Sequence, residues 1–161
     1  MNGTIPYNME YDIDRLLPTE QISLAEPPAK KNDAIAFLLD LVVENDRVND
    51  REAALEALKD RERETTTGVG KGIAIPHAQT DGVSQPSVAF CRSEAGLDFD
   101  SMDEQPAHLI FEILVPEGGS DDHLEILSSL SRSLMHDEVR EGLYDAESPE
   151  GIQAVLREAI D

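Results

Sequence analysis

The sequence predicts a single-domain α/β fold, a sandwich in which a mixed β-sheet is flanked by helices. Its 161 residues are the usual length of one domain and can bury a sizeable core. Short apolar runs typical of strands alternate with longer segments in which apolar residues recur every three or four positions, as on one face of a helix. Such alternation is typical of α/β sandwiches. Residues 1–19 show no clear period, so we expect a lead-in there and one folded domain over residues 20–161.

The first part of the domain is expected to hold one strand and two helices. Residues 21–24 alternate between polar and apolar and predict a short strand. A helix is expected over 30–45, capped by Asn32-Asp33, and a second helix over 51–63. The apolar positions are Ile35, Leu38, Leu39, Val42 and Val43 in the first helix, and Ala54, Leu55 and Leu58 in the second.

Three further strands are expected in the second half of the chain. They cover residues 73–75, 86–92 and 107–115, and the last is the most apolar segment of the sequence. Pro76 ends the first of them, because proline has no N–H to give to a strand ladder. Residues 96–99 are interpreted as a turn.

The remaining segments predict helices. The third helix is expected over 121–135, and residues 136–142 are expected to form a short helical turn. Ser148 is the expected cap of a last helix, with Pro149 at its first position. The inward positions are Leu124, Leu127, Leu130 and Leu134 in the third helix, and Ile152, Val155, Leu156 and Ile160 in the last.

The charge balance is strongly acidic. Asp and Glu number 34 against 13 Lys and Arg, which gives a formal net charge of −21. Phosphate backbones would be repelled, so nucleic-acid binding is disfavoured. An acidic, lysine-poor surface suits high salt, where self-repulsion is screened over a few ångströms, and we therefore hypothesise a halophilic source. The alternative is an ordinary acidic cytosolic protein.

Cysteine content and hydropathy indicate the cellular compartment in which the protein is expected. The single cysteine, Cys91, excludes an internal disulfide framework and is interpreted as a small core or interface hydrophobe within its strand, in preference to a nucleophile. No apolar run approaches membrane-spanning length, and the N-terminus lacks a signal-peptide pattern. We expect a cytoplasmic protein without stable membrane insertion.

Residues 65–82, TTTGVGKGIAIPHAQTDG, are the stretch that the rest of the chain holds in place. Gly68, Gly70 and Gly72 are expected to allow positive φ and close backbone approach. His77 follows directly after the predicted strand and Pro76, where ligand sites open in α/β sheets. The alternative for His77 is a loop histidine without a role.

A nucleotide or metal site is not supported locally. GVGKG suggests a phosphate-binding loop, but Thr65 stands where that motif needs glycine, and Gly72 stands where it needs Ser or Thr. The four histidines form no closely spaced ligand pair. We expect neither a metal nor another cofactor.

Two other side chains could contact an anion. His123 lies at the expected start of the third helix, after Ser120 as cap, where it could donate to an anion beside free amides. It could equally be a surface histidine. Arg61 and Arg63 precede the glycine stretch and suit bidentate phosphate contact, or they could simply be exposed and paired with the glutamates beside them.

The segment RERETTTGVGKGIAIPHAQTDGV resembles the signature of enzyme IIA domains of the fructose/mannitol type in the bacterial phosphotransferase system. In that family the pattern R-E-x-x-x-[ST]-T-G-[IV]-G-x-G-[IV]-A-[IL]-P-H surrounds the phosphorylated histidine. The likeness continues through SVAFCRSEAGLDFD and PAHLIFEILVPEGGSDDHLEILSSLSRSL, over roughly residues 20–161. One departure is Thr65, where glycine is frequent.

The resemblance implies roles for individual residues. His77 matches the phospho-accepting histidine, Arg61 the active-site arginine, and His123 a second active-site histidine that steadies the phosphate. The phosphate pocket is expected to include Thr67, Gly68 and Gly70. The implied reaction passes a phosphoryl group from the phosphocarrier HPr to His77 and on to a cysteine of the enzyme IIB of a fructose-type permease. The alternative is a regulatory phosphohistidine module, as in the nitrogen-related enzyme IIA paralogues.

Overall fold

A computed structural model describes residues 13–118 and 122–160 of the chain, except the side chains of residues 122–124 and 160. In chain order the elements are α2 (Ile13–Leu16), the 3-10 helix η1 (Thr19–Gln21), β1 (Ile22–Ser23), α3 (Lys31–Glu44), α4 (Arg51–Glu64), β2 (Gly68–Gly70), β3 (Ile73–Ala74), β4 (His77–Gln79), β5 (Ser87–Leu97), β6 (Ala107–Val115), α5 (Asp122–Leu134), α6 (Asp137–Asp145) and α7 (Pro149–Ile160). None of the helices in the described part is long and apolar enough to cross a membrane.

The sheet is mixed, as the sequence predicts. Its strands follow the order β1-β5-β6-β3-β2, and β4 also pairs with β6. The central pair β5 and β6 is antiparallel, whereas β1 is parallel to β5, and β3 and β4 are parallel to β6. The most apolar segment of the sequence, β6, is therefore the central strand, and it contacts three other strands.

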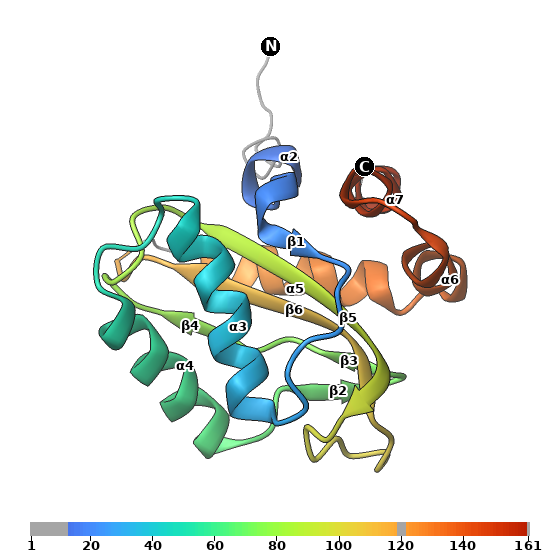
Figure 1. The fold of residues 1–161 in the computed structure, drawn as a ribbon, viewed down its shortest axis with the longest axis horizontal. Helices are drawn as coiled ribbons and strands as arrows, with labels where there is room; N and C mark the ends of the chain where they lie inside the picture. The colour runs from blue at the N-terminus through green and yellow to red at the C-terminus, as the bar shows by residue number, and fades with distance from the viewer. Residues whose placement is uncertain (1–12, 119–121, 161) are drawn as a thin grey trace.

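Helices cover both faces of this sheet. Figure 1 shows α3 and α4 in front of the sheet and α5 behind it, with α6 and α7 to one side. One core cluster joins α3 and α4 to alternate positions of β5 and β6, including Ala89 and Ile110. The other joins α2, α5, α6 and α7 to the positions between them, including Phe90 and Phe111. The predicted single-domain sandwich is thus confirmed.

Pro76 interrupts a strand without ending it, which corrects the expectation that His77 follows the strand's end. Ile73 pairs with Leu109 and His77 with Ile113, so β3 and β4 run along β6 in one register. The proline removes one donor from the ladder, but its carbonyl still accepts a hydrogen bond from the Ile113 amide at 2.9 Å. His77 is therefore the first residue of β4.

The predicted bounds of several elements are confirmed. Residues 107–115 form β6 as predicted, and the helix expected over 51–63 extends by one residue to Glu64. Ser148 caps α7, because its Oγ accepts a hydrogen bond from the Gly151 amide at 3.1 Å. Residues 13–16, from the expected lead-in, form α2 and pack against α7. The boundary at residue 19 stays a prediction.

Other local predictions are wrong. The cap of α3 is Lys30, and Asn32-Asp33 lie within the first turn because the helix begins earlier than their side chains suggested. Gly96 and Leu97 belong to β5 and form no turn, since Leu97 pairs with Ala107 across a bulge. Ser120, the expected cap of the third helix, lies outside the described residues.

Candidate functional site

His77 lies on the face of the sheet that α5 covers. Paired residues of neighbouring strands point to the same face, and its partner Ile113 belongs to the core cluster on that side. The residue is 7% exposed, and its Nδ1 lies 2.7 Å from the carbonyl oxygen of Ile75. A carbonyl can only accept a hydrogen bond, so Nδ1 donates, and in the neutral ring Nε2 holds the lone pair. The contact orients the imidazole and selects its tautomer.

The glycines preceding His77 form a hairpin between β2 and β3. Gly70, Lys71 and Gly72 all have positive φ, at 91°, 58° and 80°, which turns the chain tightly. Gly68 does not share this conformation, contrary to expectation. It is required for a close approach, because a Cβ there would lie 2.2 Å from the Ser101 Oγ.

Thr67 is held by the carboxylate of Glu62. Its amide and its hydroxyl donate to the two carboxylate oxygens, at 3.1 Å and 2.6 Å. Its carbonyl accepts a hydrogen bond from the Ile75 amide at 2.9 Å. One series of contacts therefore runs from Glu62 through Thr67 and Ile75 to His77.

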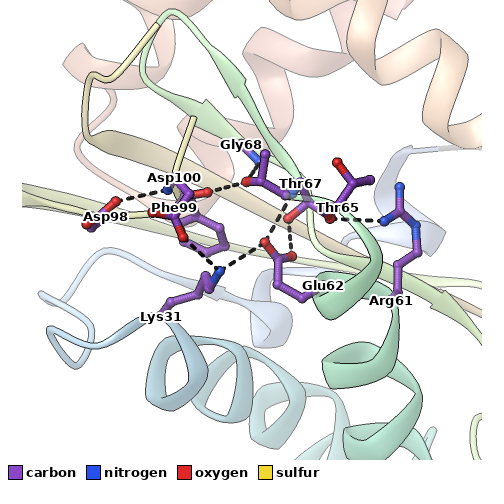
Figure 2. Close-up of polar contacts among 10 residues, drawn as sticks. Lys31, Arg61, Glu62, Thr65, Thr67, Gly68, Asp98, Phe99 and Asp100 are labelled. Atoms are coloured by element: carbon purple, nitrogen blue, oxygen red, sulfur yellow. Dashed lines mark hydrogen bonds and ion pairs between the residues drawn. The ribbon is translucent and has the colours of Figure 1, made fainter. Parts of the chain in front are cut away.

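Glu62 also contacts Lys31, as Figure 2 shows. The Nζ of Lys31 lies 3.4 Å from the carboxylate and 3.7 Å from the carboxylate of Asp100. Beside it, the Thr66 hydroxyl donates to the carbonyl of Phe99. These contacts join the start of α3, the end of α4 and the loop after β5 around residues 65–68.

Arg61 lies in the last turn of α4, which packs against β4. It is half-buried, and its guanidinium donates to the carbonyl of Thr65 at 3.2 Å. Arg63 is exposed and pairs with Asp60. The open alternative, pairing of both arginines with the adjacent glutamates, is therefore not what the structure contains.

His123 is the second residue of α5, on the same side of the sheet as His77. Its side chain lies outside the described residues, so its contact with a phosphate stays a prediction. The structure thus joins Thr67 and His77 through hydrogen bonds, adds Gly68 and Gly70 in the adjoining hairpin, and places Arg61 at the neighbouring helix end.

The other histidines and the cysteine have structural positions. His108 is half-buried on the sheet, where its Nδ1 lies 2.8 Å from the Ser93 carbonyl. His136 precedes α6 as its N-cap. Cys91 is fully buried, and burial, with the nearby Glu112 adding to it, raises the pKa of its thiol. The interpretation of Cys91 as a core residue is confirmed.

Two hollows of about 450 and 550 Å³ lie elsewhere on the described surface. The first is lined by Leu24, Glu26, Arg92, Ser93, Glu94, His108 and Tyr144. The second is lined by residues of 96–106. Neither includes any of the predicted site residues.

Sequence reasoning missed the role of Glu62. The signal was present, because Glu62 continues the buried helical face of Ala54, Leu55 and Leu58 at a step of four. A carboxylate at a buried position of a helix requires partners, and those partners come from segments distant in the sequence.

Comparisons with known proteins found a matching family model and similar chains. The model of the family described as "Phosphoenolpyruvate-dependent sugar phosphotransferase system, EIIA 2" matches residues 15–159. A "PTS system fructose-specific EIIA component" of Haloferax volcanii is 61% identical over 150 residues, which are 93% of this chain and 97% of that relative.

Solved structures are also similar. The nitrogen regulatory protein IIA-Ntr of Neisseria meningitidis has a TM-score of 0.79 at 34% identity, over 89% of this chain and 98% of that one. The enzyme IIA-Mtl of Escherichia coli, in its complex with phosphorylated enzyme IIB-Mtl, has a TM-score of 0.76 at 28% identity, over 89% and 99% of the two chains.

Proposed function

Because the chain belongs to the EIIA 2 family of the phosphoenolpyruvate-dependent sugar phosphotransferase system, we propose that it is a cytoplasmic phosphocarrier of a fructose-type system. His77 accepts a phosphoryl group from phosphorylated HPr and passes it to a cysteine of an enzyme IIB. The fructose-specific Haloferax relative supports the sugar class, and the complex of a structural neighbour with phosphorylated enzyme IIB supports the second partner.

The hydrogen bond between His77 Nδ1 and the Ile75 carbonyl is the observation that carries the proposal. It leaves the lone pair on Nε2, which attacks the phosphorus while the bond to the donor histidine nitrogen breaks and its electron pair returns to that ring. Nδ1 keeps its proton, and the Ile75 carbonyl stabilises the positive charge that develops on the ring. In the second step a thiolate sulfur of enzyme IIB attacks, and the bond to Nε2 breaks.

Arg61 and His123 are proposed to stabilise the phosphoryl oxygens. Phosphoryl transfer depends mainly on positioning and charge stabilisation. Arg61 uses one of its five N–H donors on Thr65, so its planar fork can still contact two phosphoryl oxygens. His123 would add a donor from the first turn of α5, where the helix dipole also favours an anion.

A regulatory phosphohistidine module is the second candidate. Its support is the 34% identity to IIA-Ntr of Neisseria meningitidis. The 61% identity to the fructose-specific component of Haloferax volcanii favours the carrier. The two candidates share the phosphorylated histidine and differ in whether an enzyme IIB discharges it.

Incubation with phosphorylated HPr tests the proposal. We expect an acid-labile, base-stable phosphate on the wild-type protein and none on His77→Ala. Phosphate retained by His77→Ala would show that another residue is the phosphorylation site. Addition of the cognate enzyme IIB then separates the candidates, because a carrier is discharged rapidly and a regulator keeps its phosphate.

A further inference from the structure

We propose that Glu62 is a positioning residue for phosphoryl transfer, which selects the reactive tautomer of His77 through Thr67 and Ile75. This inference rests on the proposed function of His77. Glu62 itself contacts neither His77 nor, at its buried position, an incoming partner. We call the contacts of Glu62 with Thr67 and Lys31 the Glu62 clamp.

The carboxylate of the Glu62 clamp is buried, and both of its oxygens have partners. The side chain of Glu62 is 4% exposed, and each carboxylate oxygen accepts a hydrogen bond from Thr67. Lys31, itself 23% exposed, compensates the buried charge at 3.4 Å. Hydrogen bonds to a charged acceptor are among the stronger ones, and a buried carboxylate left without them would be costly. The carboxylate therefore fixes the backbone and side chain of Thr67 together, as Figure 2 shows.

The position of Thr67 reaches His77 through a single residue. The Ile75 amide donates to the Thr67 carbonyl at 2.9 Å, and the Ile75 carbonyl accepts from His77 Nδ1 at 2.7 Å. Pro76, which follows Ile75, has no N–H, so the ladder bond it makes is the one that its carbonyl accepts from the Ile113 amide. The orientation of the Ile75 carbonyl consequently depends on the contact of Ile75 with Thr67 on one side and on this Pro76 bond on the other.

A second set of contacts limits the structural effect of losing the Glu62 carboxylate. The Thr66 hydroxyl donates to the Phe99 carbonyl and accepts from the Gly68 amide at 2.9 Å. These bonds hold the same loop without Glu62, so the segment should remain folded when the carboxylate is neutralised. The expected consequence is a small displacement of the Ile75 carbonyl, which weakens its contact with Nδ1 and populates the Nε2–H tautomer, a form that cannot attack from Nε2.

The test uses Glu62→Gln, which keeps the volume and removes the charge, and Glu64→Gln as a matched control. Glu64 is exposed two residues along the same helix. Nitrogen-15 NMR of His77 in the free protein reports the tautomer, and the rate of phosphorylation by phosphorylated HPr is measured over a range of donor concentration. Thr67→Val, which removes the hydroxyl donor at similar volume, breaks the clamp from its other side and keeps the NMR test available if Glu62→Gln does not fold.

We expect the wild type and Glu64→Gln to hold the Nδ1–H tautomer, and both Glu62→Gln and Thr67→Val to show a mixture. In Glu62→Gln we expect kcat to fall by about 10- to 100-fold with KM unchanged, as displacement of a reacting group does. A wild-type tautomer in the folded clamp variants, or a Glu62→Gln rate within about twofold of wild type, would overturn the proposal. Because the tautomer is measured without phosphate, its result stands apart from a failure of His77 to accept phosphate.

Discussion

Replacing Glu112 by methionine should stabilise the protein. Glu112 lies in the middle of β6, opposite Ala89, and is 1% exposed. Neither of its carboxyl oxygens has a hydrogen-bond partner among the described residues. Burial raises its pKa well above the ordinary range, and the carboxylate of Asp40 adds to the effect. The native chain therefore holds a carboxyl group in a site that favours its neutral form.

The size of the effect follows from this burial. Burying a polar group without a hydrogen bond costs about 1–3 kcal/mol by mutational measurements. Methionine has a similar length, carries no polar group and adapts to irregular gaps. We expect Glu112→Met to raise the free energy of unfolding by about 1–3 kcal/mol near pH 4, where the buried carboxyl group is neutral. The midpoint temperature should rise by about 2–4 °C for each kcal/mol in a domain of this size.

The gain should also depend on pH, with a defined sign. Glu112 has a higher pKa in the folded state than in the unfolded chain, so folding retains its proton and wild-type stability falls as pH rises above the unfolded value of about 4.3. Methionine removes this dependence. The advantage of the variant should therefore grow with pH above about 4.3, by at most about 1.4 kcal/mol per pH unit, until the folded-state pKa is passed.

Urea denaturation of wild type and Glu112→Met between pH 4 and 8 measures both quantities, in one high-salt buffer. Glu56→Met, at an exposed position of α4, is the matched control, and it should change stability by less than about 0.5 kcal/mol at every pH. Loss of stability in Glu112→Met at pH 7, or a difference from wild type that does not change with pH, would refute the reasoning.

Three further predictions concern the site and the surface. Arg61→Lys keeps the charge but loses the planar guanidinium, so phosphoryl transfer should slow by about 10- to 1,000-fold in a rapid-mixing assay. The control Arg63→Lys should stay within about twofold of the wild-type rate, and an Arg61→Lys rate equal to that of the control would remove Arg61 from the mechanism. Gly68→Ala should lower the free energy of unfolding by about 1–3 kcal/mol in urea denaturation, because the new Cβ would lie 2.2 Å from the Ser101 Oγ. Adding Ser101→Ala should restore part of this stability, and an unchanged denaturation midpoint in Gly68→Ala would contradict the contact. The midpoint temperature should rise between 0.1 and 2 M KCl, since salt screens the net charge of −21, and greatest stability in low salt would contradict the halophilic hypothesis.

Strongly periodic segments could be predicted from the sequence. The apolar run 107–115 is β6 to the residue, and helix periodicity located α4 and α7. Predictions that relied on one residue type were less successful. Pro76 was expected to end its strand, but pairing with β6 resumes at His77 because the surrounding backbone keeps one register. Such continuity is a property of the neighbouring strand and is not visible in the local sequence.

The candidate site divides in the same way. The motif pointed to His77 and Thr67, and the structure joins them by hydrogen bonds through Ile75. The sequence placed Glu62 on a buried helix face, but its contact with Lys31 could not be predicted, because Lys31 lies 31 residues away in the sequence and only folding brings it to the carboxylate. Glu112 lies within the apolar run 107–115, so the sequence did not mark it as special. Its burial without a hydrogen-bond partner depends on the helix that packs against this face of the sheet.

Phosphorylation of His77 at Nε2 is tested most directly by nitrogen-15 and phosphorus-31 NMR of the protein after incubation with phosphorylated HPr. We predict one phosphoryl group, bonded to Nε2, with the proton retained on Nδ1 beside the Ile75 carbonyl. A phosphoryl group on Nδ1, or on any residue other than His77, would contradict the proposed role of this histidine.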